Sequence, residues 1–285
     1  IEVDTSLIYP FYDIELGNYT FYYAGTFYVE YSSMDNAGNI GTLKIQIKVT
    51  SEEEYEDDPS FEGYYSSLEG KTGYQLEDAL YTLLNNTGGS VTTTYGAARD
   101  ILEESDVWVG FNTSYLNLIY SDTLGGSANS YAKPSWDSGA TWNREHVWPK
   151  SQFGTGSYSP GNNTRGIDAD MHNLRASDTR INSNRGNMPF TSQVNNASGY
   201  GTISSTWYPG DNHRGDVARI VFYMDIRWGS MTTISKVGSL KTLLEWHELD
   251  PVDDFEINRN NVIYKYQKNR NPFIDHPELA GLLYN

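Results

Sequence analysis

The residues best suited to chemistry lie between positions 141 and 187, and three of them stand out. Glu145 and His146 are neighbours, so they offer a hard oxygen ligand beside an imidazole. Histidine is the side chain whose ordinary pKa suits proton abstraction near neutral pH. Asn182 can add an amide oxygen. One carboxylate and one amide oxygen, completed by waters, are a normal environment for Mg²⁺.

Arginines in the same region could grip phosphate oxygens, because a guanidinium group binds them through two parallel hydrogen bonds. They are Arg144, Arg165, Arg175, Arg180 and Arg185. The chain has a formal net charge of −17, yet residues 131–190 carry seven basic and five acidic side chains. Most of the acidity belongs to residues 1–105, with 19 acidic and four basic side chains. Because phosphate binding depends on local charge, the acidic total does not exclude nucleic acid.

Each of these features is weak by itself. A Glu-His pair is usually structural or incidental, and an asparagine on a helix is usually a cap or a solvated residue. Adjacent side chains of a strand point to opposite faces, so Glu145 and His146 could serve one centre only from a strand end or a bent backbone. A short helix starting near Ser177 would set Asn182 and Arg185 three apart, on one face.

The elements that position these residues follow from hydrophobic periodicity. Residues 75–84 place Leu and Ala side chains on one helical face. Further helices are expected at residues 97–104, 217–228, 240–248, 255–268 and 277–283. Residues 131–210 are dense in Gly, Asn, Ser and Pro, which predicts loops around short elements. The expected strands and helices do not alternate in a regular βαβ order, so the predicted fold class is α+β.

Residues 1–50 are predicted to be β. Residues 26–33 are rich in aromatic and β-branched side chains, and apolar and polar residues alternate over residues 43–49. Between them, residues 35–39 contain Asp, Asn and Gly, which favour the turn of a hairpin. This stretch resembles the last strands of bacterial immunoglobulin-like surface repeats. Such a sandwich needs about seven strands, so we expect a partial module.

Residues 51–60 hold six acidic side chains and are predicted to be an extended linker, because like charges repel. A calcium-binding loop is the alternative, but the oxygen ligands lack the glycine-punctuated spacing of such loops. Residues 61–285 would then form a separate domain.

Several motifs, taken together, are specific. They are residues 143–151 (NREHVWPKS), 168–175 (DADMHNLR), 181–187 (INSNRGN), 246–260 (WHELDPVDDFEINRN) and 267–278 (QKNRNPFIDHPE). In this order they resemble the endonuclease I family of secreted and periplasmic bacterial nucleases, over roughly residues 61–285. That family belongs to the His-Me finger, or ββα-metal, superfamily.

The resemblance implies a role for each matching residue. His146 would be the general base that deprotonates a water, and Glu145 and Asn182 would hold the cation. That cation would be Mg²⁺, with Mn²⁺ or Ca²⁺ as alternatives, and the products would carry 5′ phosphates. Arg165 falls between the motifs where the family has an arginine that steadies the scissile phosphate. The remaining substrate contacts are expected at Arg144, Arg175 and Arg185.

The predicted function is therefore a secreted or cell-surface, metal-dependent endonuclease that acts on DNA, RNA or both with little sequence preference, as a monomer. The chain opens at Ile1 without an initiator Met, so we expect any signal peptide to lie upstream. One alternative is an inactive surface protein with a nuclease-like domain. Another is a carbohydrate hydrolase, which needs two carboxylates across a cleft, and no pair stands out.

A further histidine and three tryptophans have both structural and functional interpretations. His172 could complete a zinc site with His146 and Glu145, but the spacing is not that of a HExxH motif, so we expect it to be structural. Trp142, Trp148 and Trp246 could stack on bases, although a place in the core is the more frequent use. The chain contains no cysteine, which excludes disulfides and thiolate metal sites.

Overall fold

The structure, a computed structural model, describes residues 61–86, 93–108, 112–120, 136, 138–153, 159–192 and 199–284, together with five strands within the first sixty residues. By its internal contacts the chain divides into two units, Ile1–Ser60 and Phe61–Asn285. The predicted turn at residues 35–39 and the predicted acidic linker at residues 51–60 lie outside the described residues. The division of the first unit into module and linker stays a prediction.

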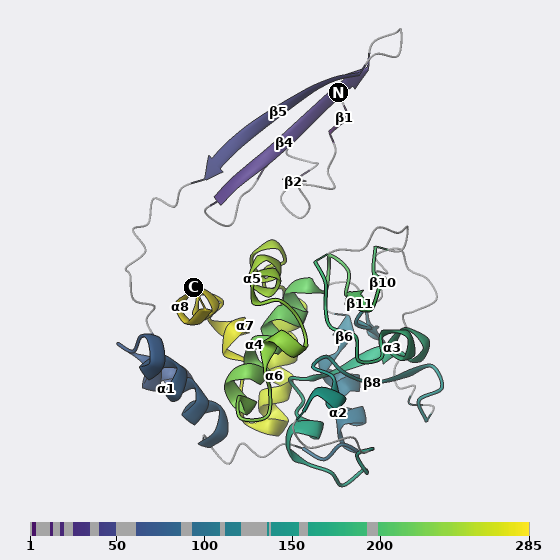
Figure 1. Cartoon of the computed structure of the whole chain (residues 1–285), viewed down its shortest axis with the longest axis vertical. Helices are drawn as coiled ribbons and strands as arrows, with labels where there is room; N and C mark the ends of the chain where they lie inside the picture. The colour runs from purple at the N-terminus through teal and green to yellow at the C-terminus, as the bar shows by residue number, and fades with distance from the viewer. Residues whose placement is uncertain are drawn as a thin grey trace. The chain divides into compact units, whose positions relative to one another are not determined.

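The first unit contains a long antiparallel hairpin. β4 (Gly25–Met34) pairs with β5 (Ile40–Val49) from Gly25↔Val49 to Met34↔Ile40, which confirms both predicted strands (Figure 1). β1 (Glu2–Val3) adds to the free edge of β4, and β2 (Tyr12–Asp13) pairs with β3 (Asn18–Tyr19). The immunoglobulin-like assignment stays a prediction.

The second unit mixes helices with short antiparallel strand pairs. Its helices are η2 (Gly63–Leu68), α1 (Gly73–Asn86), α2 (Ala98–Ser105), η4 (Lys150–Gln152), η5 (Gly166–Ala169), α3 (Thr179–Arg185), α4 (Arg214–Trp228), η6 (Ile234–Lys236), α5 (Leu240–Leu249), α6 (Asp254–Gln267), α7 (Pro272–Asp275) and α8 (Leu279–Tyr284). Its strands are β6 (Val107–Trp108), β7 (Asn112–Leu116), β8 (Trp142–His146), β9 (Leu174–Asp178), β10 (Gly201–Ile203) and β11 (Thr206–Tyr208). The α+β class and the predicted helices are confirmed, and α7 is an additional short helix before α8.

The main core of this unit surrounds α4, whose residues from 215 to 224 are all buried. α1 packs on α4 through a leucine face that includes Leu76, Leu80 and Leu84, as its periodicity predicts, and α5 and α7 also pack on α4 (Figure 1). Among the described residues, no helix is both long enough and apolar enough to cross a membrane.

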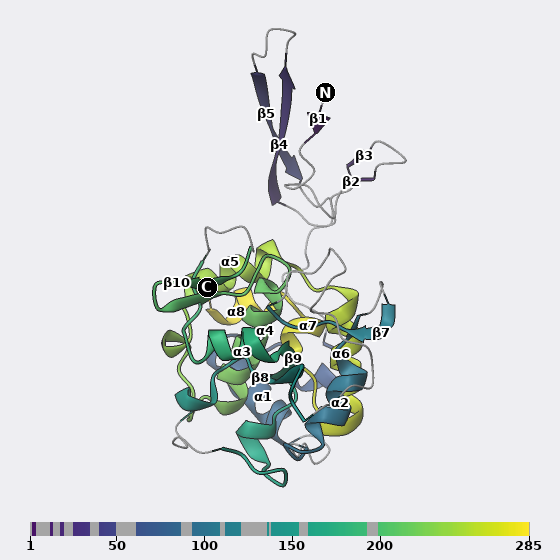
Figure 2. The ribbon, with the colours of Figure 1, turned by 90° about the vertical axis from the view of Figure 1, so that its right-hand side faces the viewer.

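A second, smaller core lies beside the β8–β9 pair. Trp142 of β8 and Leu174 and Ala176 of β9 pack there against Ile101 and Leu102 of α2. The pair is therefore fixed by apolar contacts on the side of α2. Figure 2 shows β8 and β9 beside α2.

Candidate active site

Two antiparallel strands and the helix that follows them bring the predicted residues together. The register of β8 and β9 sets Glu145 opposite Arg175. α3 follows β9 without a loop, because the Asp178 carboxylate accepts hydrogen bonds from two backbone amides of the first helical turn. β8 ends at His146. The Glu145–His146 pair thus lies at a strand end, where both side chains can serve one centre.

Glu145 is buried, with 3% of its surface exposed, and its Oε1 atom has two partners. The Tyr120 hydroxyl donates to it at 2.9 Å, and Nη1 of Arg185 lies 3.0 Å away. Burial raises the pKa of Glu145 to about 7, although Arg185, Tyr120 and the backbone amide of His146 each oppose that rise. The second carboxylate oxygen, Oε2, is used by neither Arg185 nor Tyr120.

His146 is held so that one ring nitrogen is left for chemistry. Its Nε2 atom lies 2.9 Å from the carbonyl oxygen of Asp168. Because a carbonyl can only accept, Nε2 carries the proton and Nδ1 keeps its lone pair. Burial lowers the pKa of His146 to about 4, against the opposing effect of Asp168. The imidazole is therefore neutral at pH 7, as a general base must be.

Asn182 lies on the face of α3 that packs on β8. Its Nδ2 donates to Oδ1 of Asn143 at 2.6 Å, and Arg185, one turn later, contacts Glu145. The prediction that Asn182 and Arg185 share one face of a short helix is thus confirmed. In this orientation the Oδ1 atom of Asn182 is left as an acceptor.

These two oxygens suit a hard divalent cation. A carboxylate oxygen of Glu145 and the amide oxygen of Asn182 are the ligand types that Mg²⁺ accepts, with waters completing the shell. Among the described residues, no group of three or more His, Cys, Asp or Glu side chains could hold a metal. The donor set therefore fits a cation that keeps most of its water, and it does not fit the zinc site considered for His172.

Arg144 and Arg165 lie in the neighbourhood of His146. Arg144 shares the side of β8 on which His146 lies, donates to the carbonyl oxygen of Tyr95, and has its guanidinium carbon 3.7 Å from the centre of the Tyr95 ring. Arg165 is exposed and immediately precedes η5, three residues before the Asp168 carbonyl that holds His146. Both positions are compatible with a substrate that reaches His146.

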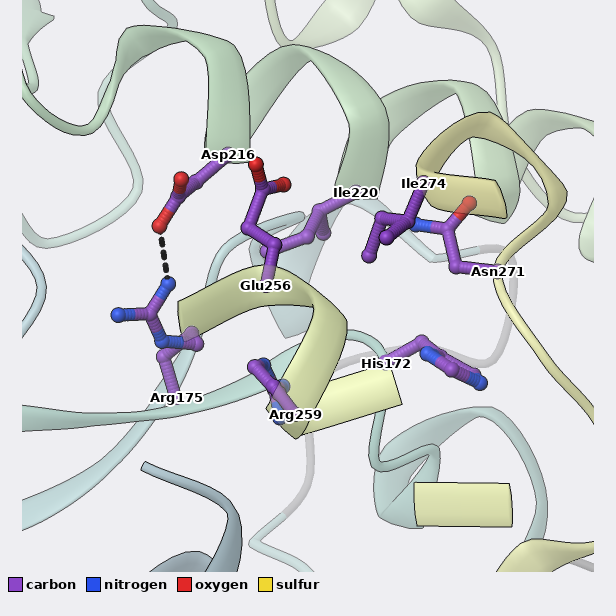
Figure 3. A pocket seen from close by; sticks show the side chains of 8 residues that line it. All are labelled: His172, Arg175, Asp216, Ile220, Glu256, Arg259, Asn271 and Ile274. Carbon is purple, nitrogen blue, oxygen red and sulfur yellow. Dashed lines mark hydrogen bonds and ion pairs between the residues drawn. The ribbon is translucent and has the colours of Figure 1, made fainter. Parts of the chain in front are cut away.

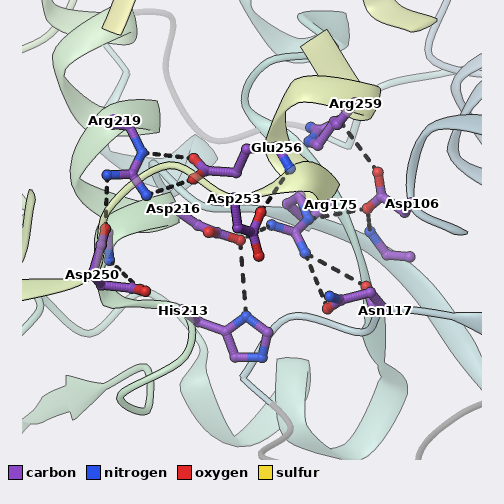
Figure 4. A network of polar contacts seen from close by, with 12 residues as sticks. Asp106, Asn117, Arg175, His213, Asp216, Arg219, Asp250, Asp253, Glu256 and Arg259 are labelled. Atoms are coloured by element: carbon purple, nitrogen blue, oxygen red, sulfur yellow. Dashed lines mark hydrogen bonds and ion pairs between the residues drawn. The ribbon is translucent and has the colours of Figure 1, made fainter. Parts of the chain in front are cut away.

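Arg175 and Arg185 are corrections to the predicted substrate contacts. Both side chains are completely buried. Arg175 pairs with Asp106 at 3.1 Å and with Asp216 at 2.6 Å (Figure 4). Arg185 binds Glu145 and donates to the carbonyl oxygen of Val147 at 2.7 Å. A guanidinium group with no solvent access and with internal partners cannot grip a phosphate, so both residues stabilise the fold.

His172 and the three tryptophans are structural. His172 is buried, its Nε2 lies 3.3 Å from the carbonyl oxygen of Asn269, and burial lowers its pKa to about 3. Trp142, Trp148 and Trp246 are buried in the two cores, as expected.

A small cavity of about 10 Å³ lies apart from His146. Figure 3 shows its lining, which comes mainly from α4, α6 and the segment around α7. Arg175 is the one predicted site residue that lines it. Its volume is about that of a single water, so it cannot admit a nucleotide.

The sequence did not predict the residues that hold the side chains of Glu145 and His146. Tyr120 binds Glu145, Tyr95 stacks on His146, and the Asp168 backbone fixes the imidazole. Tyr95 and Tyr120 lie outside the motifs, and nothing distinguishes them among the 23 tyrosines. Asp168 lies inside a motif, but its contribution is a carbonyl oxygen, which any residue carries.

Comparison with known proteins agrees with this geometry. The family model of endonuclease I matches residues 72–278. The chain is 37% identical over 239 residues to an extracellular ribonuclease of Bacillus subtilis, covering 76% of each chain. It is 36% identical over 239 residues to the Bacillus amyloliquefaciens extracellular ribonuclease, covering 77% of each. A periplasmic deoxyribonuclease of Aeromonas hydrophila is 28% identical over 167 residues, 52% of this chain and 65% of that protein. The family predicted from the motifs is thereby confirmed: this chain belongs to the endonuclease I family of nucleases.

Proposed function

We propose that this protein is a secreted, metal-dependent endonuclease of the ββα-metal type, which hydrolyses phosphodiester bonds with little sequence preference and leaves 5′ phosphates. The observation that carries the proposal is the state of His146. Its Nε2 is committed to the Asp168 carbonyl, and burial keeps the ring neutral, so Nδ1 is a free base at the end of β8.

His146 takes the proton from a water that attacks phosphorus in line. A neutral imidazole with a fixed tautomer can do this at pH 7, and general base catalysis contributes about 10²–10⁴-fold. The proton moves to Nδ1, and the Asp168 carbonyl then binds the other side of an imidazolium, which stabilises it. Tyr120 and Arg185 hold the Glu145 carboxylate in place beside this centre.

Glu145 and Asn182 would bind the cation, for which we propose Mg²⁺, with Mn²⁺ or Ca²⁺ as alternatives. When bound, it neutralises the charge that develops on the phosphate and on the departing 3′ oxygen. The raised pKa of Glu145 makes this binding depend on pH, because only the ionised carboxylate is a good ligand.

The substrate is proposed to be DNA, RNA or both. The named relatives include extracellular ribonucleases and a periplasmic deoxyribonuclease, which also supports secretion. Arg165 and Arg144 would contact the phosphate backbone. Backbone contacts carry no sequence information, so cleavage should occur at many sites.

A digest of supercoiled plasmid and of ribosomal RNA, with Mg²⁺ and with EDTA, tests the proposal. We expect cleavage with Mg²⁺, none with EDTA, and 5′-phosphate ends that a ligase accepts. Activity that survives EDTA would contradict the metal. Absence of cleavage with Mg²⁺, Mn²⁺ and Ca²⁺ alike would favour the inactive binding protein.

A further inference from the structure

A single tyrosine contacts both functional side chains on one side of β8. The Tyr95 ring stacks on the His146 imidazole, with ring centres 5.7 Å apart and planes inclined by 16°. The Arg144 guanidinium carbon lies 3.7 Å from the centre of the same ring. Residues 144 and 146 are two apart on a strand and share a side, so one ring can contact both.

The backbone around Tyr95 holds the loop that precedes η5. The amide of Tyr95 donates to the carbonyl of Thr164, and the amide of Gly96 donates to that of Asn162, both at 2.8 Å. A Cβ atom at Gly96 would lie 3.0 Å from Asn162, so the two segments pack without spare room. The Tyr95 ring is therefore fixed relative to the loop that leads to Asp168.

The hydrogen bond between His146 and Asp168 does not fix the imidazole alone. A ring held by one hydrogen bond at Nε2 can still swing about the N···O axis, and that swing moves Nδ1. The stacked Tyr95 ring blocks the swing on one face, and Phe153 meets the imidazole edge-on, with centres 6.3 Å apart. Among the described residues, the Tyr95 hydroxyl has no hydrogen-bond partner, so the ring is the part that contacts the site.

We propose that Tyr95 is a positioning residue whose ring holds the His146 imidazole, and with it Nδ1, in the orientation that takes the proton from water. The inference rests on the proposed function of His146 and adds a residue to it. A base displaced by about 1 Å can lose about 10²-fold in rate. Tyr95 contacts neither proposed cation ligand, so its loss should act on kcat through His146, and its contact with Arg144, a proposed phosphate ligand, should add only a smaller effect on KM.

The test compares Tyr95→Phe, which keeps the ring, with Tyr95→Leu and Tyr95→Met, which remove it. Tyr95→Met provides a second ring-free variant if the leucine does not fold, because methionine fills irregular gaps. The matched control is Tyr81→Leu, since Tyr81 is 49% exposed on α1 and has no part in the site. The measurements are kcat and KM on a fluorophore-quencher oligonucleotide with Mg²⁺, with rates normalised to the folded fraction from thermal unfolding.

We expect Tyr95→Phe and Tyr81→Leu to stay within about twofold of the unmodified protein, and the ring-free variants to lose about 10–10² in kcat with a smaller change in KM. A Phe variant as slow as the Leu variant would assign the function to the hydroxyl and overturn the inference. A raised KM at unchanged kcat would show that the ring acts on substrate binding through Arg144 and not on His146, which would overturn the inference. A kcat loss that disappears after normalisation would make it merely structural.

His146→Ala separates this inference from the proposed function. If that variant remains fully active, the assignment of the base is wrong. If His146→Ala is inactive while both ring-free variants keep their kcat, only the positioning role of Tyr95 is wrong.

Discussion

Two parts of the second unit use polar side chains in opposite ways. In the network of Figure 4, Arg175 and Arg219 are completely buried, and carboxylates satisfy them at 2.5 to 3.1 Å. Burial alone would lower the pKa of Arg175, but Asp106 and Asp216 raise it above its ordinary value. At the end of β8, by contrast, His146 and Asn182 are only partly buried, and each is oriented by a partner that uses one polar atom.

This contrast separates polar side chains that stabilise the fold from those proposed to act in catalysis. The Arg175 guanidinium group binds two internal carboxylates and so connects β9 to α4 and to the end of α2, which stabilises the fold. In our proposal, a side chain that is held at one polar atom and keeps another unused, as in His146 and Asn182, acts on the substrate or the cation. The first kind should change stability when it is removed, and the second kind should change activity.

The largest expected effect is that of His146→Ala. Loss of the base should lower kcat by about 10²–10⁴ while nucleic-acid binding stays near normal, because the imidazole acts on water. Binding is measured by fluorescence anisotropy with Ca²⁺, and cleavage by gel. The control is His276→Ala, a partly buried histidine outside the site that packs against Phe61 and Tyr65 and lies 3.0 Å from Glu278. A His146 variant with a third of the original activity would remove His146 from the mechanism.

The next effect concerns the buried ion pairs around Arg175. Arg175→Met removes the guanidinium partner of Asp216 and leaves Asp106 with Arg259 alone, which should lower the free energy of unfolding by about 3–5 kcal/mol. Urea unfolding measures this. Arg180→Met is the control, because the Arg180 side chain is 77% exposed and its pair with Asp178 should contribute less than about 1 kcal/mol. Equal stabilities of the two variants would contradict the division between side chains that stabilise the fold and those proposed to act in catalysis.

Acid should destabilise the protein through His172. Its folded pKa, about 3, lies below the unfolded value of about 6.5, so the unfolded chain binds a proton that the folded chain does not. This contribution is therefore fully present above pH ~6.5 and is lost as pH falls toward 3, by roughly 1.4 kcal/mol per pH unit. Urea unfolding between pH 7 and pH 5 should show a shallower decline for His172→Gln than for the unmodified protein. Parallel curves would show that His172 does not drive it.

The smallest effect should come from Arg165→Ala. Loss of one phosphate contact should slow cleavage about tenfold, or ~1.4 kcal/mol, by the same factor on unrelated sequences. The slope of log affinity against log salt should fall by about one. Lys241→Ala is the control, since Lys241 is 85% exposed on α5. A strong sequence dependence of the effect would make Arg165 a base contact instead.

Most of the second unit followed from the sequence because its helices are amphipathic or apolar over long stretches. The leucines of α1 repeat on one face, and the central part of α4, residues 217–224, is apolar except for Arg219, as suits a buried central helix. The motifs likewise identified Glu145, His146 and Asn182 as the candidate centre, and the structure places them at one strand end and on the helix packed against it. Their catalytic roles stay predictions.

What the sequence could not determine is which of the similar side chains reach the surface. Arg144, Arg165, Arg175 and Arg185 look alike along the chain, and only the tertiary structure shows that Arg175 and Arg185 are buried while Arg165 is exposed. The partners of the site come from far along the chain, with Tyr120 25 residues before Glu145. The residue types and their order determined the chemistry that is available. Burial and long-range packing decided which groups are buried with internal partners and which reach the surface, because both depend on residues that meet only when the chain folds.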